Sequence, residues 1–138
     1  MIWKSPETVF RNAIISDADF TSLAGHRVYP NIAPAEATLP FAIWRRSSVQ
    51  REQTLGRPMG VPQVRLDLQI YAETYFTARK LADAARGILD GFTGTFDNTT
   101  VSLCRLDGEA DGIAAIDGSE VPNAYLITQE YEILWQET

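Results

Sequence analysis

Residues 63–71 alternate strictly between polar and apolar side chains, and this pattern constrains the fold more than any other feature of the chain. Val64, Leu66, Leu68 and Ile70 are the apolar positions. Successive side chains of a strand point to opposite faces of a sheet, so the pattern predicts a strand with one face in the core and one in solvent. Such half-buried strands are typical of antiparallel sheets, because strands that are buried on both faces are apolar throughout.

The end of the chain repeats this alternation and predicts a second long strand. Its two faces carry different residues: Tyr125, Ile127, Tyr131, Ile133 and Trp135 on one, and Thr128, Glu130 and Glu132 on the other. Shorter extended pieces are expected at residues 27–29, 41–44 and 100–106. Residues 106–123 contain three Asp-Gly pairs, which favour turns, so we expect a loop there.

Two other parts of the chain show helical spacing. Apolar residues between positions 74 and 92 repeat at i, i+3, i+4 and i+7, which predicts a helix that Thr74 caps and that ends near Gly91. Gly87 inside this helix costs about 1 kcal/mol relative to Ala, and we expect close packing on a sheet as its reason. Residues 5–25 are expected to form two short helices, separated at residues 16–17.

Helices and one-sided strands in this order predict an α+β fold, with an antiparallel or mixed sheet and helices packed on one face. The connection between the strand at 41–44 and the strand at 63–71 is too long for a tight turn and contains Gly56, Pro58, Gly60 and Pro62. We expect an extended, mobile hairpin arm there, at residues 49–62. At 138 residues the chain is expected to be one domain, residues 1–138.

Charge is distributed unevenly along the chain. The net charge of −6 argues against a general nucleic-acid-binding protein, which would normally be basic. From Asp107 to the end there are eight acidic residues and no Lys or Arg. The segment from Arg45 to Arg57, in contrast, has four arginines and one acidic residue. This uneven distribution of charge is either a solvated surface feature or a means of orienting copies of the chain against each other. The candidate contact residues are Arg45, Arg46, Arg51, Arg57, Asp107 and Asp111.

No pattern of catalytic, cofactor-binding or metal-binding residues stands out. His26 is the only histidine and lies in a turn beside Gly25, where a solvent-facing side chain is expected. Cys104 is the only cysteine, so an intrachain disulfide is excluded, and we expect it to be a small buried side chain. The segment DGEADG approaches the spacing of a calcium-binding loop, but Gly118 stands where a bidentate Glu is needed. We therefore expect no enzyme activity, metal or cofactor.

The sequence also shows no secretion signal and no apolar run long enough to cross a membrane. Contact between the arginines of residues 45–57 and nucleic acid remains an alternative, although few aromatic residues accompany them for stacking on bases.

Two longer stretches carry a family resemblance. They are RVYPNIAPAEATLPFAIWRR, and QVRLDLQIYAETYFTARKLADAARGILDGF, which precedes the closing aromatic strand. Their order and spacing resemble the tail completion proteins of long-tailed bacteriophages, also called tail terminators or head-to-tail joining proteins, which have relatives in gene transfer agents. The most specific parts are RVYP with the following LPFAIW, and the strand-to-helix passage DLQIYAETYFTARKLADAAR.

The resemblance implies an α+β subunit without a catalytic motif, located in the virion and assembled in the cytoplasm of the bacterial host. It implies a homo-oligomeric ring, usually of six copies, that caps the tail tube and joins it to the head–neck connector. The arm would contact neighbouring subunits or the tail tube protein. DNA would pass through the lumen without specific binding, with Glu130 and Glu132 or the 107–120 segment as acidic lining.

Two alternatives remain open at this point. A head-completion or neck adaptor protein would also form a ring, but it would bind on the portal side. A small hydrolase or ligand-binding domain would use His26 with a nearby carboxylate.

Overall fold

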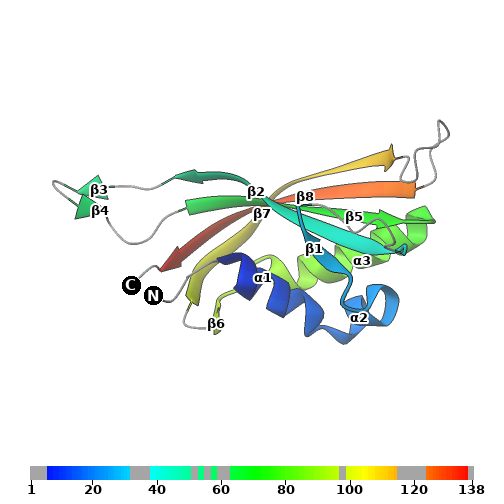
Figure 1. Ribbon diagram of the computed structural model, residues 1–138, viewed down its shortest axis with the longest axis horizontal. Helices are drawn as coiled ribbons and strands as arrows, with labels where there is room; N and C mark the ends of the chain where they lie inside the picture. Colours follow the sequence, from blue (N-terminus) through cyan, green and yellow to red (C-terminus); the bar gives the residue numbers. More distant parts are fainter. Residues whose placement is uncertain are drawn as a thin grey trace.

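A computed structural model describes residues 6–31, 38–50, 53–54, 57–58, 63–96, 99–114 and 124–136. Its main sheet has six strands in the spatial order β1-β2-β5-β8-β7-β6 (Figure 1). Their bounds are β1 (Val28–Pro30), β2 (Phe41–Gln50), β5 (Gln63–Ala72), β8 (Ala124–Gln136), β7 (Thr99–Ala114) and β6 (Gly94–Phe96). β1 runs parallel to β2, whereas the other neighbouring pairs are antiparallel, so the sheet is mixed.

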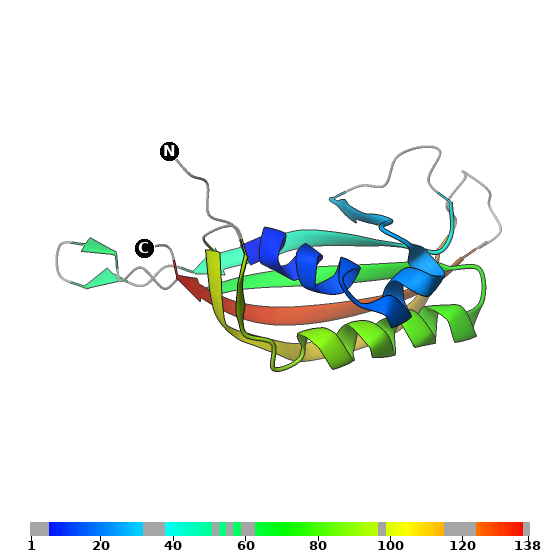
Figure 2. The same ribbon diagram turned by 90° about the horizontal axis from the view of Figure 1, so that it is seen from below.

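Three helices cover one face of this sheet: α1 (Pro6–Ile15), α2 (Ala18–Ala24) and α3 (Tyr75–Leu89) (Figures 1 and 2). We call this the helix face, and we call the opposite face, on which no described helix lies, the open face. The predicted α+β class, with a mixed sheet and helices on one side, is confirmed.

Side-chain caps begin two of the helices, and the cap at Thr74 is the one that the sequence predicts. The Asp17 carboxylate accepts a hydrogen bond from the Phe20 N–H at 3.0 Å and begins α2. The Thr74 hydroxyl accepts the Thr77 N–H at 3.2 Å and begins α3. Gly25 follows α2 with a positive φ of 58°, a conformation that glycine adopts without the steric cost of a side chain.

The hydrophobic core lies between the helices and the helix face of the sheet. The alternating apolar residues of β5 are fully buried in it, as their pattern predicts. They pack with buried residues of α3 and β8, including Leu81, Leu89, Tyr131 and Trp135. Burial of large apolar side chains is the main favourable contribution to folding, so this shared core holds the helices against the sheet.

Gly87 contradicts the expectation of close packing on the sheet. It lies on the exposed side of α3, and a Cβ atom built there would meet no atom within 4 Å. The core side of α3 is formed instead by residues such as Ala78, Ala82 and Ala85, which are buried.

The loop expected at residues 106–123 is wrong over its first half. β7 continues to Ala114 and pairs with β8 along its length. Two register shifts, between Val101 and Leu103 and between Leu106 and Gly108, mark bulges in β7. A bulge inserts an extra residue and breaks the two-residue alternation, so this strand carries no simple periodic pattern. Residues 115–123 lie outside the described residues.

The predicted arm at residues 49–62 is only partly described. β2 extends to Gln50, and β3 (Gln53–Thr54) pairs with β4 (Arg57–Pro58) in a separate two-stranded sheet. The other positions from 51 to 62 lie outside the described residues. A long mobile arm therefore stays a prediction.

Candidate interaction surfaces

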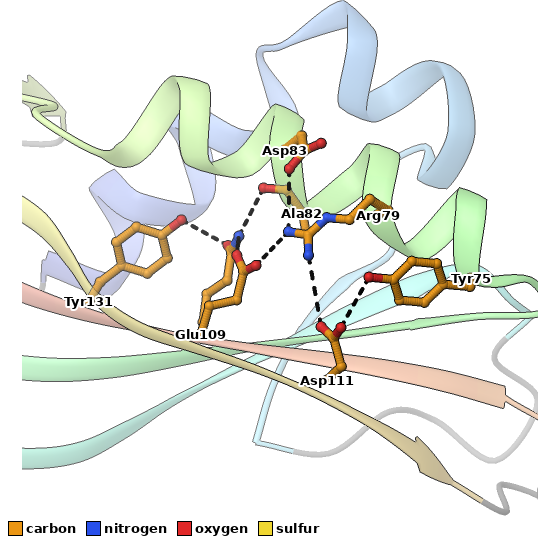
Figure 3. Close-up of polar contacts among 8 residues, drawn as sticks. Tyr75, Arg79, Ala82, Asp83, Glu109, Asp111 and Tyr131 are labelled. Atoms are coloured by element: carbon orange, nitrogen blue, oxygen red, sulfur yellow. Dashed lines mark hydrogen bonds and ion pairs between the residues drawn. The ribbon is translucent and has the colours of Figure 1, made fainter.

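A polar cluster joins α3 to β7 on the helix face (Figure 3). The Arg79 guanidinium lies 2.6 Å from the Glu109 carboxylate, 3.3 Å from Asp83 and 3.8 Å from Asp111. The Tyr75 hydroxyl donates a hydrogen bond to Asp111 at 3.0 Å. One arginine thus contacts all three carboxylates and holds the helix against the strand.

Gln129 of β8 forms the buried part of this cluster. Its amide nitrogen donates to the Ala82 carbonyl at 2.8 Å and to the Glu109 carboxylate at 2.9 Å. Its amide oxygen accepts from the Tyr131 hydroxyl at 2.8 Å. Burial would raise the pKa of Glu109, but hydrogen bonds from Gln129 and Arg79, together with the positive charge of Arg79, lower it below its usual value. Glu109 is therefore held as a carboxylate at neutral pH.

The open face carries a second set of charged contacts. The Arg45 guanidinium lies 3.5 Å from Asp67 across β2 and β5. Arg65 lies 2.8 Å from Asp107, which ties β5 to β7 across β8. Arg105 forms an ion pair with Glu132 of β8, whose carboxylate also accepts a hydrogen bond from Gln63 at 2.6 Å. The described open face is thus a mixture of both charges rather than a patch of one sign.

The structure distributes the predicted contact residues over different surfaces. Arg45 lies on the open face, whereas the Arg46 guanidinium stands 6.0 Å from the ring centre of Trp135, on the helix face. Asp107 contacts the open face and Asp111 the helix face, so the two carboxylates do not form one surface.

Two of the predicted contact residues are described less fully. Arg57 lies in β4, and Arg51 lies outside the described residues. A role for the six residues between subunits stays a prediction.

Neither His26 nor Cys104 belongs to a cluster of reactive groups. His26 is exposed, and its backbone carbonyl accepts from Arg11 at 3.3 Å. Cys104 is buried, as expected, and burial raises the pKa of its thiol to about 12, so the thiol stays protonated at neutral pH. Among the described residues, no group of three or more His, Cys, Asp or Glu side chains could hold a metal ion. No helix within these residues is long and apolar enough to cross a bilayer.

An exposed apolar patch lies where α3 begins and β8 starts, and sequence reasoning missed it. Phe76 is 78% exposed, Ile113 is 63% exposed, and Tyr75 and Tyr125 are each 41% exposed. Ile113 and Tyr125 are cross-strand partners, and the rings of Tyr75 and Tyr125 meet edge to face at 6.2 Å. The alternation of the last strand correctly places Tyr125 on the helix face. The residue is nevertheless exposed, because the hydrophobic core does not extend to this end of the strand. The exposure of Phe76 could have been predicted, because the residue falls outside the apolar stripe that helical spacing defines on α3.

Comparison with known proteins gives a structural match and a family match for this chain. The fold matches a chain from the solved structure titled "Virion of native gene transfer agent (GTA) particle", with a TM-score of 0.75 over 92% of this chain and 91% of that chain. The two sequences are 12% identical, so this likeness shows the fold alone. No curated protein sequence gives a significant match. The family model described as "Tail completion protein gp17" matches residues 9–115, which include most of α1 and all of α2, α3, β5 and β7. The chain therefore belongs to the tail completion protein gp17 family.

Proposed function

We propose that this chain is the tail terminator of its particle. Copies of it form a closed ring, of six subunits by analogy with the family, that ends the tail tube and joins it to the head–neck connector. The observation that carries the proposal is the family match over residues 9–115, most of the chain. It agrees with the sequence resemblance, which rests on the β1-to-β2 passage and on the β5-to-α3 passage.

The charge of the subunit supports the passage of DNA through such a ring without specific binding. The net charge is −6, and the described arginines of the open face are each placed against carboxylates. Phosphate binding needs arginines or lysines that can exchange counterions for phosphate groups. Arginines that already contact carboxylates on their own sheet are poor candidates for this exchange.

Deletion of the gene from the genome that encodes it tests the proposal. Without its terminator, a tail tube has no defined end, so we expect full heads beside unjoined tails of irregular length in electron micrographs. An intact copy supplied in trans should restore joined particles and serves as the control. Tails of normal length beside heads that have lost DNA would instead indicate a head-completion adaptor. Normal yields of infectious particles would contradict both roles.

Native mass spectrometry of the purified chain, alone and mixed with tail tubes, tests the ring itself. We expect one closed oligomer of defined size, with six copies as the leading value. A monomer under both conditions would overturn the ring.

A further inference from the structure

β7 has a partner on its outer side over only part of its length. β6 pairs with it at Thr99, Thr100 and Val101. Further along, the Cys104 carbonyl accepts a hydrogen bond from the Gly91 N–H at 2.7 Å, and the Leu106 N–H donates to the Asp90 carboxylate at 3.0 Å. From residue 108 to residue 113, no described strand lies on this outer side. We call this stretch the β7 edge.

The register with β8 shows which backbone groups of the β7 edge point outward. Leu106 points its N–H outward and lies opposite Tyr131. Backbone orientation along a strand repeats every two residues. The β7 residues opposite Gln129, Ile127 and Tyr125 therefore also direct their N–H and C=O groups outward, away from β8. Those partners are Glu109, Asp111 and Ile113.

The exposure of Glu109 agrees with this orientation. Its side chain is only 24% exposed, yet the residue as a whole is exposed, so its backbone lies in solvent.

A free edge of this kind is a surface that another strand can extend. Natural sheets protect such edges with proline, with charged side chains (lysine above all), with bulges, or with very short edge strands. The β7 edge reads GEADGI, contains neither proline nor lysine, and begins directly after a bulge. Its two carboxylates are turned toward Arg79, and it ends at the exposed side chain of Ile113, opposite Tyr125. Backbone groups supply the hydrogen bonds and the apolar patch supplies burial, as in recognition by strand addition.

The other side of the sheet also has a gap, at the opposite end of the strands, so a contact between the two gaps displaces one copy along the strand direction. β1 pairs with β2 only at Ala42, Ile43 and Trp44, and no described strand lies beside β2 at residues 45–50 on that side. β2 and β7 run in opposite directions, because three antiparallel pairings separate them. If the sheet continues from one copy to the next, β7 therefore meets β2 as an antiparallel neighbour.

Charge favours this pairing over the alternative of two β7 edges. Arg46 of β2 lies on the helix face, as do Glu109 and Asp111 of the β7 edge, whereas Arg45 lies on the open face against Asp67. Opposite charges on neighbouring strands stabilise their pairing, whereas two acidic edges would repel.

We propose that the β7 edge pairs with residues 45–50 of β2 in a second copy, so that the sheet continues around the ring. The contact joins two different surfaces and can repeat until the ring closes. The proposal rests on the proposed function, since it assumes that copies assemble.

Replacing Ile113 with proline tests the backbone contribution. Ile113→Pro removes an outward N–H while leaving the ladder with β8, and Gly112 before it tolerates the restriction that proline imposes. Ile113→Ala is the matched control, because it also loses the side chain but keeps the N–H. We expect the proline variant to associate about tenfold more weakly than the alanine variant by sedimentation velocity, with equal circular dichroism. Equal association of the two folded variants would overturn the proposal.

Cross-linking tests which strand is the partner. Ser48 and Ala110 are exposed, and they fall on the open face by register, so cysteines there would be neighbours across the proposed contact. With a short bismaleimide, we expect Ser48→Cys with Ala110→Cys to give covalent multimers. The matched control is Ser48→Cys with Ser22→Cys, where Ser22 is exposed on α2. The native Cys104 is buried and should not react.

The outcomes separate the two proposals. Multimers from the 48/110 pair alone support the edge contact. Rings seen by native mass spectrometry without selective cross-links would overturn the edge contact and leave the terminator function standing. Monomers both alone and with tail tubes would overturn the ring and the edge contact together.

Discussion

Gln129 occupies a position in β8 where the strand alternation places an apolar side chain. It is fully buried, and each of its amide atoms has a hydrogen-bond partner: Ala82, Glu109 and Tyr131. A buried amide is costly unless it is paired, so a residue with this much pairing is a fixed part of the packing between α3 and the sheet. The alternation predicts the burial of this position but not its partners, because two of them come from α3 and from beyond a bulge in β7.

We predict that Gln129→Leu lowers the free energy of unfolding by about 1–3 kcal/mol, because the Tyr131 hydroxyl would be left buried without its hydrogen-bond acceptor and Glu109 would lose a donor. Urea denaturation followed by circular dichroism measures the change. Thr128→Val, on the half-buried open side of the same strand, is the control and should change stability by less than about 0.5 kcal/mol. A Gln129→Leu variant as stable as the wild type would show that the network adds no net stability.

The lowered pKa of Glu109 predicts a specific dependence of stability on pH. A carboxylate with a lower pKa in the folded state stabilises the fold above its unfolded pKa, near 4.5, and loses that contribution as pH falls through its folded value. We therefore expect wild type to be more stable than Glu109→Gln at pH 7, with the difference shrinking as the pH is lowered below about 4.5. Urea midpoints at several pH values measure it. A difference that stays constant down to pH 3 would argue against the role of the carboxylate charge.

At the scale of elements, a helix or strand could be predicted where its apolar residues repeat with one uninterrupted period. β5 and α3 each keep one period from end to end, and their bounds and caps follow from the sequence. β7 does not, because its inward side chains are Val101, Cys104, Leu106 and Glu109, spaced three, two and three residues apart. The bulges that create this spacing depend on pairing with β8, which local sequence does not contain. The same bulges place Glu109 beside Arg79, so that part of the polar cluster was equally hidden.

Gly87 offers a test of helix propensity without packing effects. We predict that Gly87→Ala raises the free energy of unfolding by about 1 kcal/mol, because the position is exposed, helical and open to a methyl group. Gly91→Ala is the contrasting variant: it has equal space but a φ of 85°, so strain should lower stability by about 1 kcal/mol. Thermal denaturation measures both. If both substitutions shift stability in the same direction, backbone conformation is not what separates the two glycines.

For the whole molecule, the sequence predicted the family and the fold better than the contact surface. The uneven charge was visible in the chain, but not that Asp107 and Asp111 would face Arg65 and Arg79 of their own subunit. A contact between copies depends on surfaces that meet only after folding, and neither periodicity nor composition specifies how they align. Contact between subunits through the arginines of the arm stays a prediction.

We predict that Arg51→Glu with Arg57→Glu weakens self-association, and that the wild-type contact weakens between 0.1 M and 1 M salt as the Debye length falls from about 10 Å to about 3 Å. Asp107→Lys with Asp111→Lys should partly restore assembly, provided that circular dichroism shows the variant folded. Lys80→Glu on the exposed side of α3 is the control for a change in net charge. Native mass spectrometry at two salt concentrations gives the readout. An unchanged oligomer distribution after the arginine reversal would mean that these charges are only solvated.

We also predict that deleting residues 51–60 leaves the subunit folded but unable to join tails to heads. The stretch is rich in Gly, Pro and polar residues, which cannot build a core of their own, so the thermal unfolding midpoint should change little. Counting joined particles by electron microscopy after complementation measures the effect. Joined, infectious particles at wild-type yield would exclude a role for the stretch.

Glu109 and Asp111 each have two ends that serve different surfaces. Their side chains hold Arg79 of α3, and their backbone groups form the free outer side of β7. If a partner strand binds this edge, we expect it also to restrict these side chains, which would couple the sheet edge to the helix layer. Such coupling is reciprocal: a partner that orders the edge strengthens the attachment of α3, and a change that loosens α3 weakens the hold on that partner by the same factor. Substitutions in Tyr75 or Arg79, far from any strand edge in sequence, would then be felt as changes in affinity between copies.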